Sequence, residues 1–314
     1  MTAIDTQSLP VSRRSGTRSS YSRHRRETVF KVLGLLATLV GLVALAALLF
    51  DLAVHGIPRL SWDFFFNFPS RRAVIAGILS AWVGSLLVIL VTAAIAVPLG
   101  VSAGIYLEEY ARKNIFTNII EINVSNLAGV PSIIYGLLAL GLFVYTFGTG
   151  RSIFTAGLTL ALLILPIIIV ATRAAIRAVP QALREGALAL GATKWQVTRD
   201  HVYPAALPGV LTGVIIGVSR ALGETAPLIT IGALTFIAFL PTPPISTEPP
   251  FISFQWLWDS FTVLPIQAFN WVSRPGDDFH ANAAAAGLVL LILTLSLNGA
   301  AIYLRYRLRK KLQW

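Results

Sequence analysis

The stretch SIFTAGLTLALLILPIIIVAT, residues 152–172, decides the class of fold. It contains no charged residue, and a helix needs about 20 mostly apolar residues to cross the hydrocarbon core of a bilayer. The chain around it has 314 residues, of which 55% are hydrophobic and only 12% are charged. Soluble domains average about 25% charged residues. The composition therefore argues against a soluble enzyme and predicts an all-α integral membrane protein.

Six such apolar stretches predict six transmembrane helices. We expect them near residues 31–54, 74–105, 127–147, 153–176, 208–240 and 281–304. The fifth is taken as one long helix, because the charged patch inside it contains no residues typical of a tight loop. The six spans form one domain over residues 29–314, preceded by a basic tail, residues 1–28, that we expect to be disordered.

The distribution of basic residues predicts the orientation of the spans. Nineteen of the 25 Lys and Arg residues lie in the two terminal tails and in the connections between spans 2 and 3 and between spans 4 and 5. Five lie on the opposite side. The positive-inside rule then places both termini in the cytoplasm. The net charge of +11 is thus a topology signal that also attracts anionic lipid, and nucleic-acid binding is not expected.

The connection between spans 4 and 5, residues 178–208, has the pattern of a helical hairpin. Gln181–Leu190 are good helix formers, and Gly191 suits the position that ends a helix. Thr193 and Gln196 match a capping box that starts a second short helix. An amphipathic basic hairpin can lie on the membrane surface or contact a protein partner, and these residues alone do not decide between the two.

The external loop between spans 5 and 6, residues 241–280, is the longest connection. Its first ten residues are rich in proline, which resists regular structure. Its tryptophans are typical of an aromatic belt at the membrane interface. We expect a loop that lies on the membrane and carries no specific site.

The octet RALGETAP, residues 220–227, places charges inside the fifth span. Arg220 lies about 16–17 Å along the helix from Gly209, near the middle of the bilayer. An Arg at that depth costs about 2.5–3.5 kcal/mol on insertion scales. Glu224 lies one turn further on the same face, so the two side chains can pair. Such a pair either fastens helices together or serves a function.

Anion handling is the function that this octet favours. The planar guanidinium of Arg220 offers two-point donation to a tetrahedral oxyanion, and the hydroxyl of Thr225 adds a donor. Glu224 would hold Arg220 when the pathway is empty and would help to release the anion. Pro227 removes the helical hydrogen bond to Gly223, so we expect a kink that acts as a gate.

The hairpin contains a motif that resembles the EAA loop of ABC-importer permeases. The run EGALALG, residues 185–191, is followed by Pro204 thirteen residues after its last glycine. The positions that match the family pattern are Glu185, Ala187, Gly191 and Pro204; those that depart from it are Gly186, His201 and Tyr203. In that family the loop inserts into a groove of a separate ATPase subunit. The chain itself has no G-x-x-x-x-G-K-[ST] motif, so the resemblance implies that ATP and Mg are bound by the partner ATPase and that this chain binds no cofactor.

The octet and the segment NLAGVPSIIYG, residues 126–136, resemble the permeases of phosphate importers of the PstA type, with the PstC type as the close alternative. The resemblance covers residues 25–314. It implies the architecture of a type I ABC-importer permease in the bacterial inner membrane. The implied partners are a second, PstC-like permease that forms a heterodimer, two ATP-binding subunits and a periplasmic phosphate-binding protein. Read from its residues alone, segment 126–136 is equally a broken helix start, and we favour a packing role.

The sequence therefore predicts a non-catalytic permease subunit that moves inorganic phosphate into the cytoplasm by alternating access. Another tetrahedral oxyanion, sulfate or molybdate, is the alternative, because Arg220 alone does not distinguish them. A stand-alone ion-coupled carrier is a second alternative and would work without an ATPase. A membrane enzyme is not expected. The four histidines are scattered without the spacing of metal ligands, so no metal site is predicted either.

Overall fold

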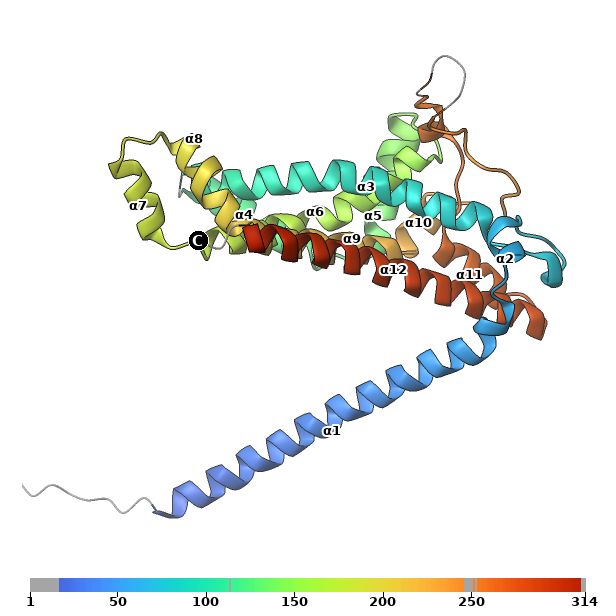
Figure 1. The fold of residues 1–314 in the computed structure, drawn as a ribbon, viewed down its shortest axis with the longest axis horizontal. Helices are drawn as coiled ribbons and strands as arrows, with labels where there is room; N and C mark the ends of the chain where they lie inside the picture. Colours follow the sequence, from blue (N-terminus) through green and yellow to red (C-terminus); the bar gives the residue numbers. More distant parts are fainter. Residues whose placement is uncertain (1–16, 113, 246–250, 252, 312–314) are drawn as a thin grey trace, which may run out of the picture. The chain divides into compact units, whose positions relative to one another are not determined.

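The computed structural model describes residues 17–112, 114–245, 251 and 253–311 of the chain, and every regular element in these ranges is a helix (Figure 1). Within them, five helices are long and apolar enough to cross a membrane, or six if one bent pair counts as a single span. The predicted all-α membrane class is therefore confirmed. Residues 1–16 of the tail that we expected to be disordered lie outside the described residues.

The chain divides into two compact units, Met1–Asp51 and Leu52–Trp314. The described part of the first unit is helical and belongs to helix α1, Thr17–Gly56, whose last five residues lie in the second unit. The helix begins inside the predicted tail, so residues 17–28 are helical. Once the apolar span has formed a helix, each further residue that becomes ordered gains one hydrogen bond. The helix can therefore extend beyond the span into residues 17–28. Residues 29–50 of the helix are mostly apolar, and it is long and apolar enough to cross a membrane.

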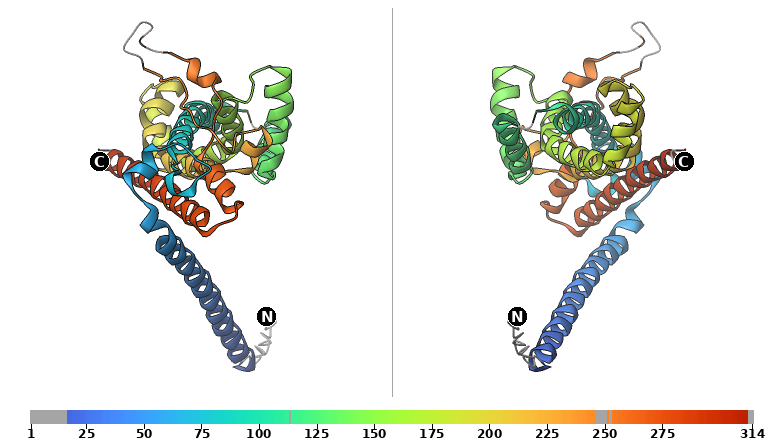
Figure 2. Two further views of the ribbon diagram at one scale, coloured as in Figure 1. Left: turned by 90° about the vertical axis from the view of Figure 1, so that its right-hand side faces the viewer. Right: turned by 90° about the vertical axis from the view of Figure 1, so that its left-hand side faces the viewer.

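Three helices form the core of the second unit: α3 (Leu79–Ile105), α6 (Ile153–Arg177) and α9 (Tyr203–Gly223). α6 packs against both of the others, and more of its residues are buried than those of any other described candidate span. The views in Figure 2, turned by 90°, show these helices nearly end-on within one bundle. Helix α12, Asp277–Lys311, lies along α9. The fourth predicted span, 153–176, thus has almost the predicted bounds.

Small residues let α9 approach α6 closely. Gly209, Gly213 and Gly217 form a stripe along α9, four residues apart. A Cβ atom on Gly209 would lie 2.7 Å from the Cβ of Ala175, and one on Gly213 would overlap the Cβ of Ala171. The stripe therefore packs helix on helix, as its spacing predicts.

The third span is broken, where we predicted one helix over 127–147. Helix α4, Ile115–Leu127, is followed by α5, Ser132–Ala139, which continues as a π-helical segment η4, Leu140–Thr146. The two parts are bent by 105°. Pro131 stands at the N-cap of α5; its ring disfavours helical geometry in the preceding residue, and it has no N–H to continue the ladder.

The fifth span does not have the predicted bounds, 208–240. Its helical stretch runs from Lys194 to Gly223, so it both begins and ends earlier in the chain. α9 ends at Gly223 and a short helix α10 covers Ala226–Thr230; among the described residues after it, the next helical element is η6, Gln255–Trp258. Glu224 has extended backbone angles (φ −77°, ψ 127°). The predicted kink is therefore a complete helix end.

The predicted surface loop 241–280 contains part of the core. Helix α11, Leu264–Val272, packs on α12. Trp271 is fully buried, and Trp256 is 7% exposed, so neither belongs to an interfacial belt. Trp271 packs in the buried cluster of α11 and α12, and Trp256 packs in the buried cluster around α6. Residues 246–250 and 252 of this loop lie outside the described residues.

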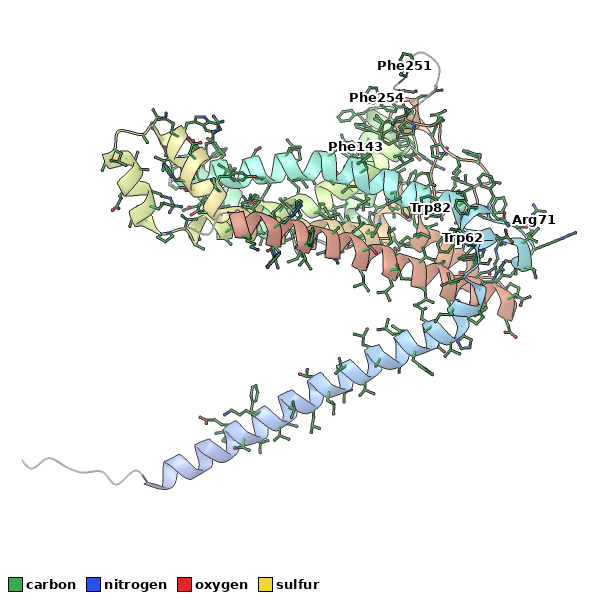
Figure 3. The ribbon with its side chains drawn as sticks, in the orientation of Figure 1. Trp62, Arg71, Trp82, Phe143, Phe251 and Phe254 are labelled. Atoms are coloured by element: carbon green, nitrogen blue, oxygen red, sulfur yellow. The ribbon has the colours of Figure 1, made fainter. Side chains whose placement is uncertain are left out.

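The same end of the bundle carries two further short elements. They are η1, Ile57–Arg59, and α2, Trp62–Phe66. The Arg59 guanidinium donates to the side-chain oxygen of Asn282 and to the carbonyl of Ala73 (2.8 Å), which ties this end to α12. Trp62 is 81% exposed and extends outward from α2 (Figure 3). We call this end the α2 end.

Substitution of Gly213 by Ala tests the contact between α9 and α6. The added methyl group overlaps Ala171, so we expect destabilisation of about 1–3 kcal/mol, seen as a lower unfolding midpoint of the full chain in detergent. The matched control is Gly299→Ala on α12, where a Cβ atom meets nothing within 4 Å and where Ala favours the helix. An unchanged midpoint in Gly213→Ala would contradict the packing described here.

Candidate functional site

Arg220 and Glu224 form the ion pair that their spacing predicts. The Nε atom of Arg220 lies 3.2 Å from Oε1 of Glu224. The Arg220 side chain is 43% exposed and that of Glu224 is 17% exposed. The guanidinium is thus held at one edge by the carboxylate, while much of it remains accessible to a ligand or to another chain.

The level of Arg220 along the bundle follows from the packing of α9 on α6. A Cβ atom on Gly217 would lie 3.3 Å from Cγ1 of Ile168 and 3.6 Å from Cβ of Ile164. Ile164 is near the middle of α6, and the two helices run antiparallel. Arg220, about 4.5 Å further along α9, is therefore level with the middle of α6.

The backbone changes direction directly after this pair. Gly223 is the last residue of α9, and Pro227 supplies no N–H for the next turn, so the helix ends and restarts as α10. Thr225 stands at the N-cap of α10, and its carbonyl accepts from the N–H groups of Leu228 (3.1 Å) and Ile229 (3.0 Å). Its hydroxyl makes no capping bond. The predicted site residues thus lie at a helix junction.

The two segments that resemble phosphate-importer permeases meet at this junction. α5 packs on α10 so closely that a Cβ atom on Gly136 would lie 2.7 Å from the Cα of Pro227 and would overlap the side chain of Thr230. Tyr135, which is 8% exposed, donates to the carbonyl of Leu127 (2.8 Å) and bridges the break between α4 and α5. Gly136 therefore has the packing role that we favoured for its segment.

The hairpin forms as predicted. Helix α7 covers Gln181–Ala189, Gly191 adopts φ +86°, and α8 covers Lys194–Gln196. The Thr193–Gln196 capping box is present, with Oε1 of Gln196 2.8 Å from the backbone nitrogen of Thr193. We call residues 181–196 the knob.

Its predicted contact residues divide into two groups. Ala187 is 7% exposed and packs in a cluster of buried side chains, so it anchors α7 on the bundle. Glu185 is exposed, and Leu190 (91%) and Trp195 (59%) are strongly exposed apolar side chains. Pro204 does not end a helix: it lies near the start of α9, inside the continuous helical stretch Lys194–Gly223, directly after the π-helical turn η5, Val197–Val202.

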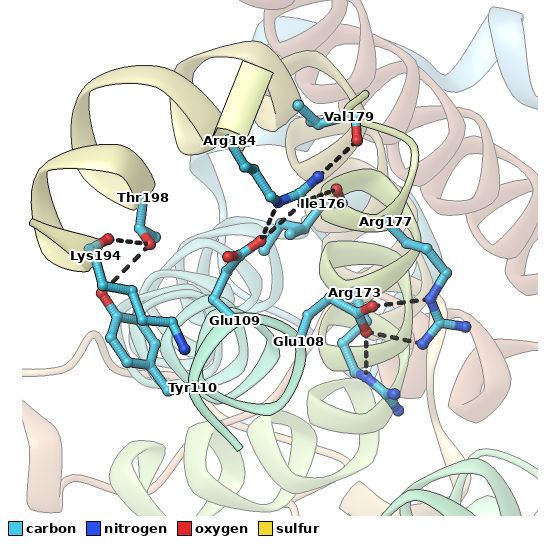
Figure 4. A network of polar contacts seen from close by, with 10 residues as sticks. All are labelled: Glu108, Glu109, Tyr110, Arg173, Ile176, Arg177, Val179, Arg184, Lys194 and Thr198. Atoms are coloured by element: carbon cyan, nitrogen blue, oxygen red, sulfur yellow. Dashed lines mark hydrogen bonds and ion pairs between the residues drawn. The ribbon is translucent and has the colours of Figure 1, made fainter. Parts of the chain in front are cut away.

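A charge network near the knob was not predicted. The carboxylate of Glu108 binds Arg177 at two points, both 2.9 Å, and Nε of Arg173 at 3.4 Å (Figure 4). Arg173 also pairs with Glu121 of α4. These four residues link α3, α4 and α6. A groove of about 460 Å³ between α4 and α6 is lined by Arg173, Arg177 and Glu121.

The sequence contained one signal for this network. Glu108 and Glu109 are adjacent acids directly after a long apolar span, on the side where basic residues gather. We read those basic residues only as a topology signal, whereas three of them are ion-pair partners. In the described part of the chain, no group of three or more metal-ligand side chains comes together.

Comparisons with known proteins agree with this architecture. The family model of the binding-protein-dependent transport system inner membrane component matches residues 96–310. The chain is 33% identical over 283 residues to the phosphate transport system permease protein PstA of Haemophilus influenzae, which covers 88% of this chain and 93% of the relative. It is 32% identical over 303 residues to PstA of Yersinia pestis, covering 95% of each. The probable ABC transporter permease protein YqgI of Bacillus subtilis is 32% identical over 283 residues, which is 89% of this chain and 94% of the relative.

Solved structures agree on the fold. A chain of a bacterial alginate ABC transporter superposes with a TM-score of 0.63 at 14% identity, covering 91% of this chain and 97% of the other. A chain of the MetNI methionine ABC transporter superposes with a TM-score of 0.56 at 18% identity, covering 72% and 93%. The apolar helices make the chain a multi-pass membrane protein with the fold of ABC-importer permeases. The chain therefore belongs to the family of binding-protein-dependent transport system inner membrane components.

Proposed function

We propose that the chain is the permease subunit of an ATP-driven importer that moves inorganic phosphate from the periplasm to the cytoplasm by alternating access. The observation that carries the proposal is the Arg220–Glu224 pair, which lies level with the middle of α6 with the guanidinium 43% exposed. A cation kept at that depth among apolar helices is costly, so a function is expected of it. The relatives named as phosphate permeases support phosphate as its substrate.

The roles at the junction follow from the geometry. Arg220 donates to phosphate through the edge of the guanidinium that Glu224 does not occupy. Glu224 takes the guanidinium back when the anion leaves, which favours release. Thr225 adds a hydroxyl donor near the start of α10, and Gly223 with Pro227 lets the chain bend there. α5 packs on this hinge, so a movement of α10 requires a movement of α5.

The knob is the contact with the ATPase in this proposal. Leu190 and Trp195 expose large apolar surfaces on it, and Glu185 adds an exposed carboxylate. Two ATP-binding subunits would supply ATP and Mg, and a second, PstC-like six-span chain would pair with this one. A periplasmic phosphate-binding protein would deliver substrate to the α2 end. The knob and both termini are then cytoplasmic, in agreement with the distribution of basic residues.

Replacement of Arg220 by Ala tests the proposal. The complete complex, assembled with the ATPase, the second permease and the binding protein, is reconstituted in proteoliposomes, and ATP-dependent uptake of radioactive phosphate is measured. We expect Arg220→Ala to reduce uptake about 10- to 100-fold, the worth of hydrogen bonds to a charged group, while the complex still assembles. Arg220→Lys should fall between, because it keeps the charge and loses the planar fork.

Three outcomes contradict the proposal at different points. Uptake at the normal rate in Arg220→Ala refutes the role of the guanidinium. Uptake of sulfate or molybdate in place of phosphate by the wild-type complex refutes the assigned substrate. Transport by the chain alone, without ATPase or ATP, refutes the importer and favours an ion-coupled carrier.

Replacement of Gly191 by Ala tests the knob. At φ +86° a side chain costs about 1–2 kcal/mol, so the turn between α7 and α8 should open and the exposed Leu190 and Trp195 should lose their relative placement. We expect weaker copurification of the ATPase and lower transport. Gly186→Ala is the matched control, since Gly186 lies in α7 with ordinary backbone angles and open space around it. Equal copurification in both variants would contradict the contact.

A further inference from the structure

The knob is attached to the bundle by apolar packing on one side. Ala187 of α7 contributes to a buried cluster, and the other buried members of this cluster are Ile176, Val179, Val197, Val202, Ala206 and Val210. These contacts hold α7 against the end of α6 and the start of α9. Apolar contacts are not directional, so they allow α7 to rotate or slide.

One side chain of α7 adds directional contacts. The Nε and Nη2 atoms of Arg184 lie 3.1 and 2.9 Å from Oε1 of Glu109. Its Nη1 donates to the carbonyl of Val179 (2.7 Å), and its Nη2 also donates to the carbonyl of Ile176 (2.8 Å). Ile176 lies in the last turn of α6 and Val179 follows directly after the helix, at the end where a cation is favoured. The arginine therefore joins three elements at once (Figure 4).

This contact is shielded from solvent. The side chain of Arg184 is 16% exposed and that of Glu109 is 9% exposed. In the described structure Glu109 has Arg184 as its ion-pair partner, and α3 leads directly into the segment that carries Glu109. If α7 moves, Arg184 moves with it. Because the ion pair is shielded, water does not replace Glu109 as the partner of Arg184, so the movement is passed on to Glu109.

The segment that carries Glu109 has side-chain contacts with three helices. It is η3, Tyr106–Tyr110, a π-helical turn that extends α3. Glu108 binds the α6 arginines, Glu109 binds Arg184 of α7, and Tyr110 contacts the α8 side, with its hydroxyl 3.4 Å from Oγ1 of Thr198. Lys194 lies 5.2 Å over the Tyr110 ring. Three consecutive residues of η3 therefore reach α6, α7 and α8.

We propose that Arg184 is a positioning residue that transmits movement of the knob to α3 and α6, through Glu109 and the carbonyls of Ile176 and Val179 at the end of α6. The inference rests on the proposed function, because it takes the exposed face of the knob as the surface that the ATPase moves. α6 is the helix on which α9 and Arg220 are packed, so a rigid link from α7 to α6 reaches the substrate pathway.

The test measures phosphate transported per ATP hydrolysed in the same proteoliposomes, for the complete complex. Arg184→Ala should still copurify with the ATPase and hydrolyse ATP, because the apolar cluster and the exposed face of the knob are unchanged. The ratio of phosphate to ATP should fall about tenfold, the scale of a coupling loss of 1.4 kcal/mol. Glu109→Gln should lower the ratio similarly, and the double variant should be no worse than either single variant, because all three changes remove the same link.

Two further variants complete the design. Arg199→Ala is the control, since Arg199 lies next to the knob, is 69% exposed and pairs only with its sequence neighbour Asp200 in the described structure; its ratio should equal that of the wild type. Arg184→Lys preserves the charge in case the alanine variant does not fold, and it should give an intermediate ratio because it lacks the planar fork.

Distinct results overturn the inference. A wild-type ratio in Arg184→Ala, or in Glu109→Gln if the alanine variant does not fold, shows that the link transmits nothing. A parallel loss of ATPase copurification and ATP hydrolysis in both variants, with an unchanged ratio, shows a purely structural role. A wild-type complex that does not transport phosphate contradicts the proposed function instead, and is recognised because it fails before any variant is compared.

Discussion

The close approach of α9 to α6 is the constraint on which the rest of the structure depends. Glycines at 209, 213 and 217 bring the two backbones together, and that contact determines the height of Arg220 in the bundle. The same contact sets the level in the bundle of the ion pair, of the helix end after Gly223 and of the contact between α10 and α5. A larger residue in the stripe would shift the guanidinium relative to every helix that surrounds it.

The same helix α6 connects the two ends of the proposed mechanism. Its middle supports α9 beside Arg220, and its C-terminal end receives Arg184 from the knob and Glu108 from η3. In the proposed importer, movement imposed by the ATPase on the knob reaches the anion pathway through one continuous helix. Rigid helices joined by buried, directional ion pairs suit this task better than loops.

The sequence was sufficient to predict the features that depend on local pattern. Apolar length predicted the spans, and helix signals predicted α7, the Gly191 turn and the Thr193–Gln196 capping box. The spacing of four between Arg220 and Glu224 predicted their pairing, because one helical turn brings the side chains together.

Features that depend on contacts between distant segments were not predicted. The segment around Pro131 was read as a broken helix start and Pro227 as a kink, but the 105° bend at the first, the complete helix end before the second and the packing of α5 on α10 were not predicted. The loop 241–280 was expected on the surface, but burial of Trp271 against α12 outweighs its proline-rich start. The partners of Glu108 and Glu109 lie more than sixty residues away, and no periodicity records such pairs.

The central claim is that Arg220 faces a water-filled anion pathway in the assembled complex. The chain contains no cysteine, so a single Arg220→Cys substitution gives a unique thiol whose rate of modification by a charged, water-soluble reagent can be measured. Ile216→Cys, one turn earlier on α9 and 57% exposed, is the apolar reference. The account predicts faster modification at 220 than at 216. Equal, slow modification at both positions would show that residue 220 faces lipid or a dry contact between subunits and would contradict the account.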